Sequence, residues 1–113
     1  MFKGKERWIL KILAVGDIVG ENGVKKLKEV LPKLRQDEKI DFCIVNAENS
    51  AGGMGITTKI FHELIELKID VITMGNHTWG KKDIFTFIDH PKIIRPANYS
   101  NGVVRKGVWN IWM

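Results

Sequence analysis

The sequence is poor in the features that mark secreted or membrane proteins. It contains a single cysteine, Cys43, so no disulfide can form within the chain, and a reducing cytoplasmic location is expected. Because Cys43 lies in an apolar run, we expect it to be a small buried residue. No apolar stretch is long enough to cross a membrane, and Lys11 interrupts the apolar start with no small-residue cleavage site after it. The sequence therefore predicts neither a signal peptide nor a membrane partner.

Charge of one sign is not concentrated anywhere in the chain. The 113 residues include 18 Lys and Arg against 13 Asp and Glu, a net charge of +5, without a block of five or six like charges. This excess of lysine is typical of a solvated surface, and attraction of an anionic substrate or nucleic acid is the alternative. The composition, 44% hydrophobic and 27% charged, predicts one globular domain over residues 1–113, with residues 1–7 as a loose extension.

Two glycine-rich nucleotide-binding motifs are also absent. The glycines between Gly16 and Gly23 are spaced G-x-x-x-G-x-x-G, whereas the dinucleotide-binding fingerprint is G-x-G-x-x-G. The sequence has no Gly-Lys-Ser/Thr, so a P-loop is excluded as well. The segment 16–23 is therefore expected to be a turn.

What the chain does contain is an alternation of short apolar runs with amphipathic segments. The expected strands are residues 8–15, 42–45, 71–74 and 93–94, and the expected helices are residues 24–34, 59–67 and 82–88. The first strand should be buried on both faces, and Pro32 should kink or end the first helix. Thr57 or Thr58 should cap the second helix. The alternation predicts an α/β fold with a parallel sheet flanked by helices.

Polar side chains follow three of these strands at the point where each strand ends. Asp17 follows the first strand, Glu48 and Asn49 follow the second, and Asn76 and His77 follow the third. Since the carboxyl ends of parallel strands converge on one crevice, these five side chains are expected to share a site. Carboxylates, amides and an imidazole suit divalent metals together with one group for proton transfer or phosphate contact.

Each of these residues also has a structural interpretation. Asp17 alone fits a turn or helix cap, and Glu48 could be a solvated loop carboxylate. His77 could lie at the surface, although its place after a buried strand and before Trp79 favours a functional role. Arg95 fits phosphate binding and pairing with a structural carboxylate equally well. The remaining histidines are expected at the surface or at a helix end, and these are His62 and His90.

Four motifs in one order carry a resemblance to a known family. They are Gly-Asp-Ile-Val-Gly at 16–20, Asn-Ala-Glu-Asn at 46–49, Ile-Thr-Met-Gly-Asn-His-Thr-Trp at 72–79 and Arg-Pro-Ala-Asn at 95–98. Together they resemble the bacterial YmdB-like metallophosphoesterases, a branch of the calcineurin-like superfamily, over roughly residues 12–107. The resemblance implies the first half of a metallophosphoesterase α/β sandwich.

The resemblance also implies a function. It implies a phosphodiesterase with two divalent transition metals, iron or manganese, that hydrolyses 2′,3′-cyclic or 3′,5′-cyclic nucleotides or an RNA-derived phosphodiester. By position, the metal ligands would be Asp17, Glu48, Asn49 and Asn76, and His77 would be the catalytic residue that helps to protonate the leaving group. Members of the family are oligomers, so a homo-oligomer is implied.

The departure from the family pattern lies after residue 90. Family members are longer, and their second half supplies further histidine ligands in a Gly-His-Thr-His type of motif, whereas this chain has no histidine after His90. The chain is therefore expected to correspond to the amino-terminal half of the enzyme, with weakened metal binding, impaired activity and a tendency to associate. The alternative is a truncated, non-catalytic remnant that binds nucleotide or RNA through its basic surface.

Overall fold

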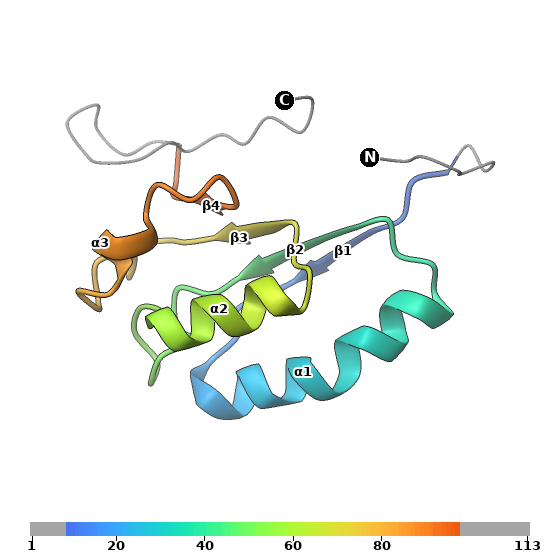
Figure 1. The fold of residues 1–113 in the computed structure, drawn as a ribbon, viewed down its shortest axis with the longest axis horizontal. Coiled ribbons are helices and arrows are strands. Elements are labelled where there is room, and N and C mark those ends of the chain that lie inside the picture. The colour runs from blue at the N-terminus through green and yellow to red at the C-terminus, as the bar shows by residue number, and fades with distance from the viewer. Residues whose placement is uncertain (1–8, 98–113) are drawn as a thin grey trace.

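A computed structural model describes residues 9–97, in which four strands alternate with three helices (Figure 1). The elements are β1 (Ile12–Val15), α1 (Gly20–Asp37), β2 (Phe42–Asn46), α2 (Thr58–Glu66), β3 (Val71–Thr73), α3 (Ile84–Phe87) and β4 (Ile93–Ile94). All neighbouring strands are parallel and follow the order β1-β2-β3-β4. The predicted α/β class and parallel sheet are confirmed. The expected extension at 1–7, Asn98 and the last residues, 99–113, lie outside the described part of the chain.

The core lies between the sheet and the helices α1 and α2, which cover the same side of the sheet (Figure 1). One row of the sheet consists of Val15, Val45, Ile72 and Ile93, which are register partners from strand to strand. The last three of these are completely buried. On the helices, Leu31 and Leu64 belong to the same cluster. This packing holds the sheet rigid beneath the loops that leave its carboxyl edge.

The strand β1 is not buried on both faces, which corrects the prediction. Ile12 is 53% exposed and Ala14 is exposed, while Leu13 and Val15 are partly buried. Within residues 9–97, β1 pairs only with β2, and α1 and α2 both lie on the same side of the sheet (Figure 1). An apolar run predicts a doubly covered strand only when both neighbours and both layers are present. The strand is also shorter than expected, because residues 9–11 are not part of it.

The helix α1 is longer than predicted at both ends. It begins at Gly20, inside the expected turn, and continues through Pro32 to Asp37. Proline lacks an N–H group and disturbs the preceding turn, but packing can outweigh this cost, and Leu31 beside it is 1% exposed. The helix α2 is capped as predicted, because the Thr57 side chain accepts the Ile60 N–H at 3.3 Å.

Cys43 is completely buried, as expected for a small apolar residue in β2. Burial raises the pKa of the thiol, the Arg35 charge lowers it and the Asp70 charge raises it further. The thiolate is thus disfavoured, which makes Cys43 a structural rather than a reactive residue. The cytoplasmic location stays a prediction. Within residues 9–97, no helix is long and apolar enough to span a bilayer.

Candidate metal and phosphate site

The loops after β1, β2 and β3 are tied together beyond the ends of the strands. Ile18 N–H donates to the Asn46 carbonyl at 3.2 Å, and Ala47 N–H donates to the Thr73 carbonyl at 3.0 Å. Gly20 N–H donates to the Asn49 carbonyl at 2.9 Å. These backbone bonds bring the residues that follow the three strands to one edge of the sheet, as the parallel topology predicts.

Asn49 links the carboxylate of Asp17 to the imidazole of His77. Its Nδ2 donates to the two Asp17 carboxylate oxygens at 3.0 and 2.8 Å. Its Oδ1 makes a short contact with His77 Nδ1. Because an amide oxygen can only accept, Nδ1 carries the proton and Nε2 is the nitrogen left for a ligand or substrate.

Glu48 contacts the same histidine. Its carboxylate accepts the backbone N–H of His77 at 3.2 Å and lies 3.9 Å from His77 Nδ1. Asn46 fixes the Glu48 segment, because its Nδ2 donates to Glu48 Oε1 and its Oδ1 accepts the Glu48 N–H, each at 3.4 Å. Four of the five side chains predicted to share a site therefore form one connected group, and these are Asp17, Glu48, Asn49 and His77.

Gly75 provides the space in which the Glu48 carboxylate sits. A Cβ atom at Gly75 would lie 2.1 Å from Glu48 Oε1 and 2.5 Å from its Cδ, so only glycine permits this position of the carboxylate. The sequence pattern assigned no role to Gly75 or to Asn46. Asn46 could have been found from its place in the polar cluster at 46–49, whereas the contact at Gly75 has no signal in a single sequence.

The glycine-rich loop after Asn49 folds back on the site rather than extending into solvent. Gly53 N–H donates to the Asn49 carbonyl at 3.1 Å, and Ala51 N–H donates to the Gly55 carbonyl at 2.9 Å. The buried Ser50 hydroxyl donates to the Ala47 carbonyl at 2.8 Å. These hydrogen bonds fix the backbone of the segment that contains Glu48 and Asn49.

The other candidate residues take different positions. Asn76 is exposed and, within the described residues, makes no hydrogen bond to this group. Arg95 is buried, and its Nη1 donates to the Pro96 carbonyl at 3.2 Å. His62 is exposed on α2, and His90 Nδ1 accepts the Lys92 N–H at 3.1 Å, so both lie on a helix surface or near a helix end as expected.

The donor set fits part of the coordination sphere of divalent metals. The two carboxylates, the amides and the imidazole are ligand types that manganese and iron accept. Across residues 9–97, however, no three His, Cys, Asp or Glu side chains are grouped so that they could hold a metal ion by themselves. The described residues therefore supply only part of a metal site, in which the Asn49 and Asn76 amides would be ligands beside the carboxylates.

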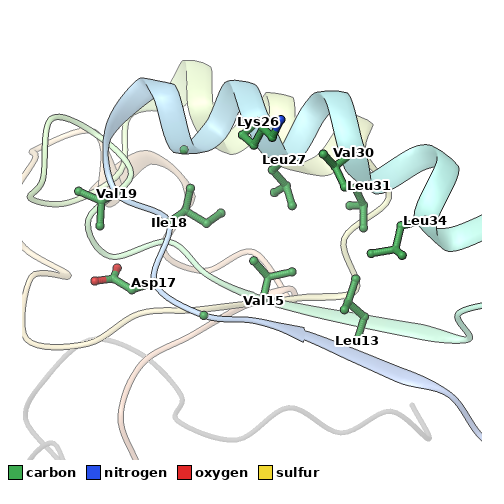
Figure 2. Close-up of a pocket in the computed structure, with 12 residues that line it drawn as sticks. Leu13, Val15, Asp17, Ile18, Val19, Lys26, Leu27, Val30, Leu31 and Leu34 are labelled. Carbon is green, nitrogen blue, oxygen red and sulfur yellow. The ribbon is translucent and has the colours of Figure 1, made fainter.

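A large apolar groove lies beside this site but does not suit the same chemistry. It has a volume of about 500 Å³ and runs between β1 and α1. Leu13 and Val15 point into it from the strand, and Leu27 and Leu31 point toward them from the helix (Figure 2). Asp17 stands at one end of this groove (Figure 2). The groove is a packing surface, because its walls are almost entirely aliphatic.

Comparison with known proteins shows which family this chain is similar to. The family model described as YmdB-like protein matches residues 13–112. A 2′,3′-cyclic-nucleotide 2′-phosphodiesterase of Bacillus subtilis is 51% identical over 100 residues, which make up 88% of this chain and 38% of that protein.

Two solved structures share the fold. A protein described as hypothetical from Thermus thermophilus superposes with a TM-score of 0.81 at 33% identity. The match covers 87% of this chain and 38% of the Thermus chain. A structure described as a novel phosphatase from Mycoplasma pneumoniae has a TM-score of 0.78 at 35% identity. The match covers 84% of this chain and 34% of the Mycoplasma chain. The chain thus spans less than two fifths of the length of these relatives.

Proposed function

This chain belongs to the YmdB-like family, and from that premise we propose that it carries one side of the active site of a metal-dependent phosphodiesterase that hydrolyses cyclic nucleotides. The observation that carries the proposal is the connected group at the edge of the sheet, in which Asn49 joins Asp17 to His77 and Glu48 contacts His77. Two carboxylates connected to one imidazole, Asp17 through Asn49 and Glu48 directly, suit phosphoryl chemistry better than a structural turn does.

We propose that the site binds two metal ions, either iron or manganese. Asp17 would bind one ion, Glu48 would bridge both, and Asn49 and Asn76 would complete ligand positions. When bound, the ions would neutralise the charge that develops on the phosphoryl oxygens. Glu48 suits a bridging role because one carboxylate has two oxygens for two cations, and Gly75 leaves room for it.

His77 is proposed as the group that gives a proton to the leaving oxygen. Asn49 holds Nδ1 and so orients the ring, and Glu48 holds the backbone N–H of the same residue. The imidazole is 32% exposed, which leaves it open to a ligand. Proton donation requires the imidazolium form, in which Nε2 carries a second proton that would point away from Asn49, toward bound substrate.

The proposed substrate is a 2′,3′-cyclic nucleotide, on the strength of the Bacillus relative's name. A 3′,5′-cyclic nucleotide or an RNA-derived phosphodiester is the wider class. The measurement is hydrolysis of 2′,3′-cyclic AMP by the purified chain with Mn²⁺ or Fe²⁺, with EDTA, and after the metal is restored. Because the chain supplies one side of the site, we expect turnover that is weak but metal-dependent, which EDTA abolishes and added metal recovers.

A matched pair of variants makes the metal test specific. Glu48→Gln removes a ligand charge at constant size and should weaken Mn²⁺ binding by at least about 10-fold in calorimetry. Glu66→Gln, at an exposed position on α2, should leave it unchanged. Salt-sensitive RNA binding that needs no metal, with no turnover under any condition, would favour the non-catalytic remnant instead.

Self-association is proposed as well, because the β1 edge and the groove beside it expose apolar surface. Within residues 9–97, Ile12 on the edge strand β1 is 53% exposed, and Val30, which lines the groove from α1, is 42% exposed. Unpaired strand edges and apolar patches of this kind favour pairing with another chain. We expect the sedimentation coefficient to rise with protein concentration between micromolar and millimolar levels. A monomer throughout that range would contradict the proposal.

A further inference from the structure

Large apolar side chains are exposed in two separate parts of the surface within residues 9–97. The first part belongs to the open edge at β1 and α1, and its members are Ile9, Leu10, Ile12, Val19 and Val30. The second part consists of Met54, Trp79 and Phe85, which we call the aromatic patch. Neither the proposed metal ligands nor the proposed catalytic residue uses this patch.

The aromatic patch is built from two segments that each leave the candidate site. Trp79 stands two residues after His77, in a turn closed by the Gly80 N–H, which donates to the His77 carbonyl at 2.9 Å. Met54 lies in the loop whose Gly53 N–H donates to the Asn49 carbonyl. Along the chain, the aromatic patch is therefore separated from His77 by one tight turn and from Asn49 by one short loop.

The two segments are pressed against each other. A Cβ atom at Gly80 would lie 2.5 Å from Met54 Cγ, and one at Gly55 would lie 2.9 Å from the Lys81 backbone nitrogen. The rings of Trp79 and Phe85 stack with centroids 5.7 Å apart and an interplanar angle of 24°. Rings at this separation already touch, so a further planar group would extend the stack rather than enter it.

The patch stands on a packed base and yet stays exposed. Ile84 and Phe87, on either side of Phe85, are buried, and the Phe87 ring stacks on Phe61 at 4.3 Å. The Asp83 carboxylate accepts the Thr58 N–H at 2.9 Å and ties α3 to the start of α2. Nevertheless Trp79 is 38% exposed and Phe85 is 62% exposed. Rigid, exposed aromatic faces bind planar ligands at a low cost in conformational entropy.

Positive charge adjoins the patch. Lys81 and Lys82 follow Trp79 closely in the chain, and both are exposed. Within the described residues neither makes an ion pair with a carboxylate. An aromatic stack bordered by lysines, next to a phosphate site, matches a ligand that is planar at one end and anionic at the other.

We propose that Trp79 and Phe85, with Met54 beside them, form a stacking platform for the nucleobase of the substrate, so that the site prefers nucleotides to phosphodiesters without a base. The proposal rests on the proposed phosphodiesterase function for its phosphate end, whereas the base end can be tested by itself. Base stacking on aromatic side chains tolerates any base, so the platform should select for the presence of a base and not for its identity.

The test follows the Trp79 indole N–H resonance by NMR in the full chain with Mg²⁺ as a diamagnetic metal. The sequence has four tryptophans, and Trp79→Phe identifies the resonance by its loss. Three probes are titrated separately: adenosine 2′,3′-cyclic phosphate, adenosine, and methyl riboside 2′,3′-cyclic phosphate, which lacks the base. We expect the first two to shift the Trp79 resonance and the third to leave it in place.

Affinities from calorimetry complete the test. Trp79→Ala should raise the Kd of adenosine 2′,3′-cyclic phosphate by about 5- to 100-fold and leave that of the base-free phosphate unchanged. Trp79→Phe should keep most of the affinity, and Gln36→Ala, at an exposed position near the end of α1, should keep all of it.

Each other outcome separates the two proposals. If the base-free phosphate binds as tightly as the nucleotide, the platform is wrong and the phosphodiesterase proposal survives. If adenosine binds through Trp79 but neither phosphate gains affinity from metal, the platform stands and the phosphodiesterase proposal fails. A Trp79 resonance that moves only with protein concentration would identify the patch as a contact between copies, and no response to any probe would overturn the platform.

Discussion

Replacing Gly75 with alanine is expected to remove most of the metal binding that this chain provides while leaving the fold intact. The new methyl group would occupy the position of the Glu48 carboxylate, which lies 2.1 to 2.6 Å from an ideal Cβ. The backbone of Gly75 does not have a positive φ, so alanine can adopt it without strain. The flexible end of Glu48 would turn away instead, and the site would lose its bridging oxygens. We expect Mn²⁺ affinity to fall by about 100-fold or more, as measured by calorimetry.

Gly16→Ala is the matched control for this substitution. Gly16 also follows a strand and precedes a proposed ligand, Asp17, but a Cβ there meets nothing within 4 Å. Its Mn²⁺ affinity should stay within about twofold of the parent chain. The thermal midpoints of both variants should lie close to that of the parent. Unchanged metal binding in Gly75→Ala would mean that Glu48 is not a ligand.

Replacing His77 with alanine is expected to lower the rate of cyclic nucleotide hydrolysis by about 10²- to 10⁴-fold, the usual contribution of a positioned general acid. The loss should appear in kcat, because the ring acts on the leaving oxygen in the transition state. Metal affinity should change much less, since Asp17 and Glu48 remain. The measurement is steady-state hydrolysis of 2′,3′-cyclic AMP at saturating Mn²⁺.

His62→Ala provides the control for the loss of an imidazole, because His62 is exposed on α2 and contacts the Phe61 ring rather than the site. It should retain the parent rate. A substrate with a better leaving group, such as a p-nitrophenyl phosphodiester, should rescue part of the His77→Ala loss, because it needs less protonation. Parent-like turnover in His77→Ala would exclude the proposed proton donor.

The sheet and the common site were predictable because both depend on local patterns and on one topological rule. Apolar runs at Phe42 to Val45 and at Ile93–Ile94 were found with errors of at most one residue. The carboxyl ends of parallel strands share an edge of the sheet, so the polar residues after them had to approach one another. Asp17, Glu48, Asn49 and His77 do so.

The errors arose where distant packing outweighed a local signal. Pro32 allowed the first helix to end near Val30 or Leu31, but the helix continues past the buried Leu31 to Asp37. The apolar run of β1 predicted burial on both faces, but Ile12 and Ala14 are exposed. Within residues 9–97, β1 has a neighbouring strand on one edge only. The contact between Gly75 and Glu48 joins residues far apart in the chain, so the sequence of either segment gives no sign of it.

The amino-acid sequence by itself determined the order of the elements, the parallel sheet and the set of polar residues at its carboxyl edge. These follow from hydrophobic periodicity and from the short-range preferences of the backbone, which act within a few residues. Only the tertiary structure decided which amide holds the imidazole, where glycine makes room for a carboxylate and which aromatic rings remain exposed beside the site. Those features are set by contacts across the fold, and their geometry exists only once the strands and loops have packed.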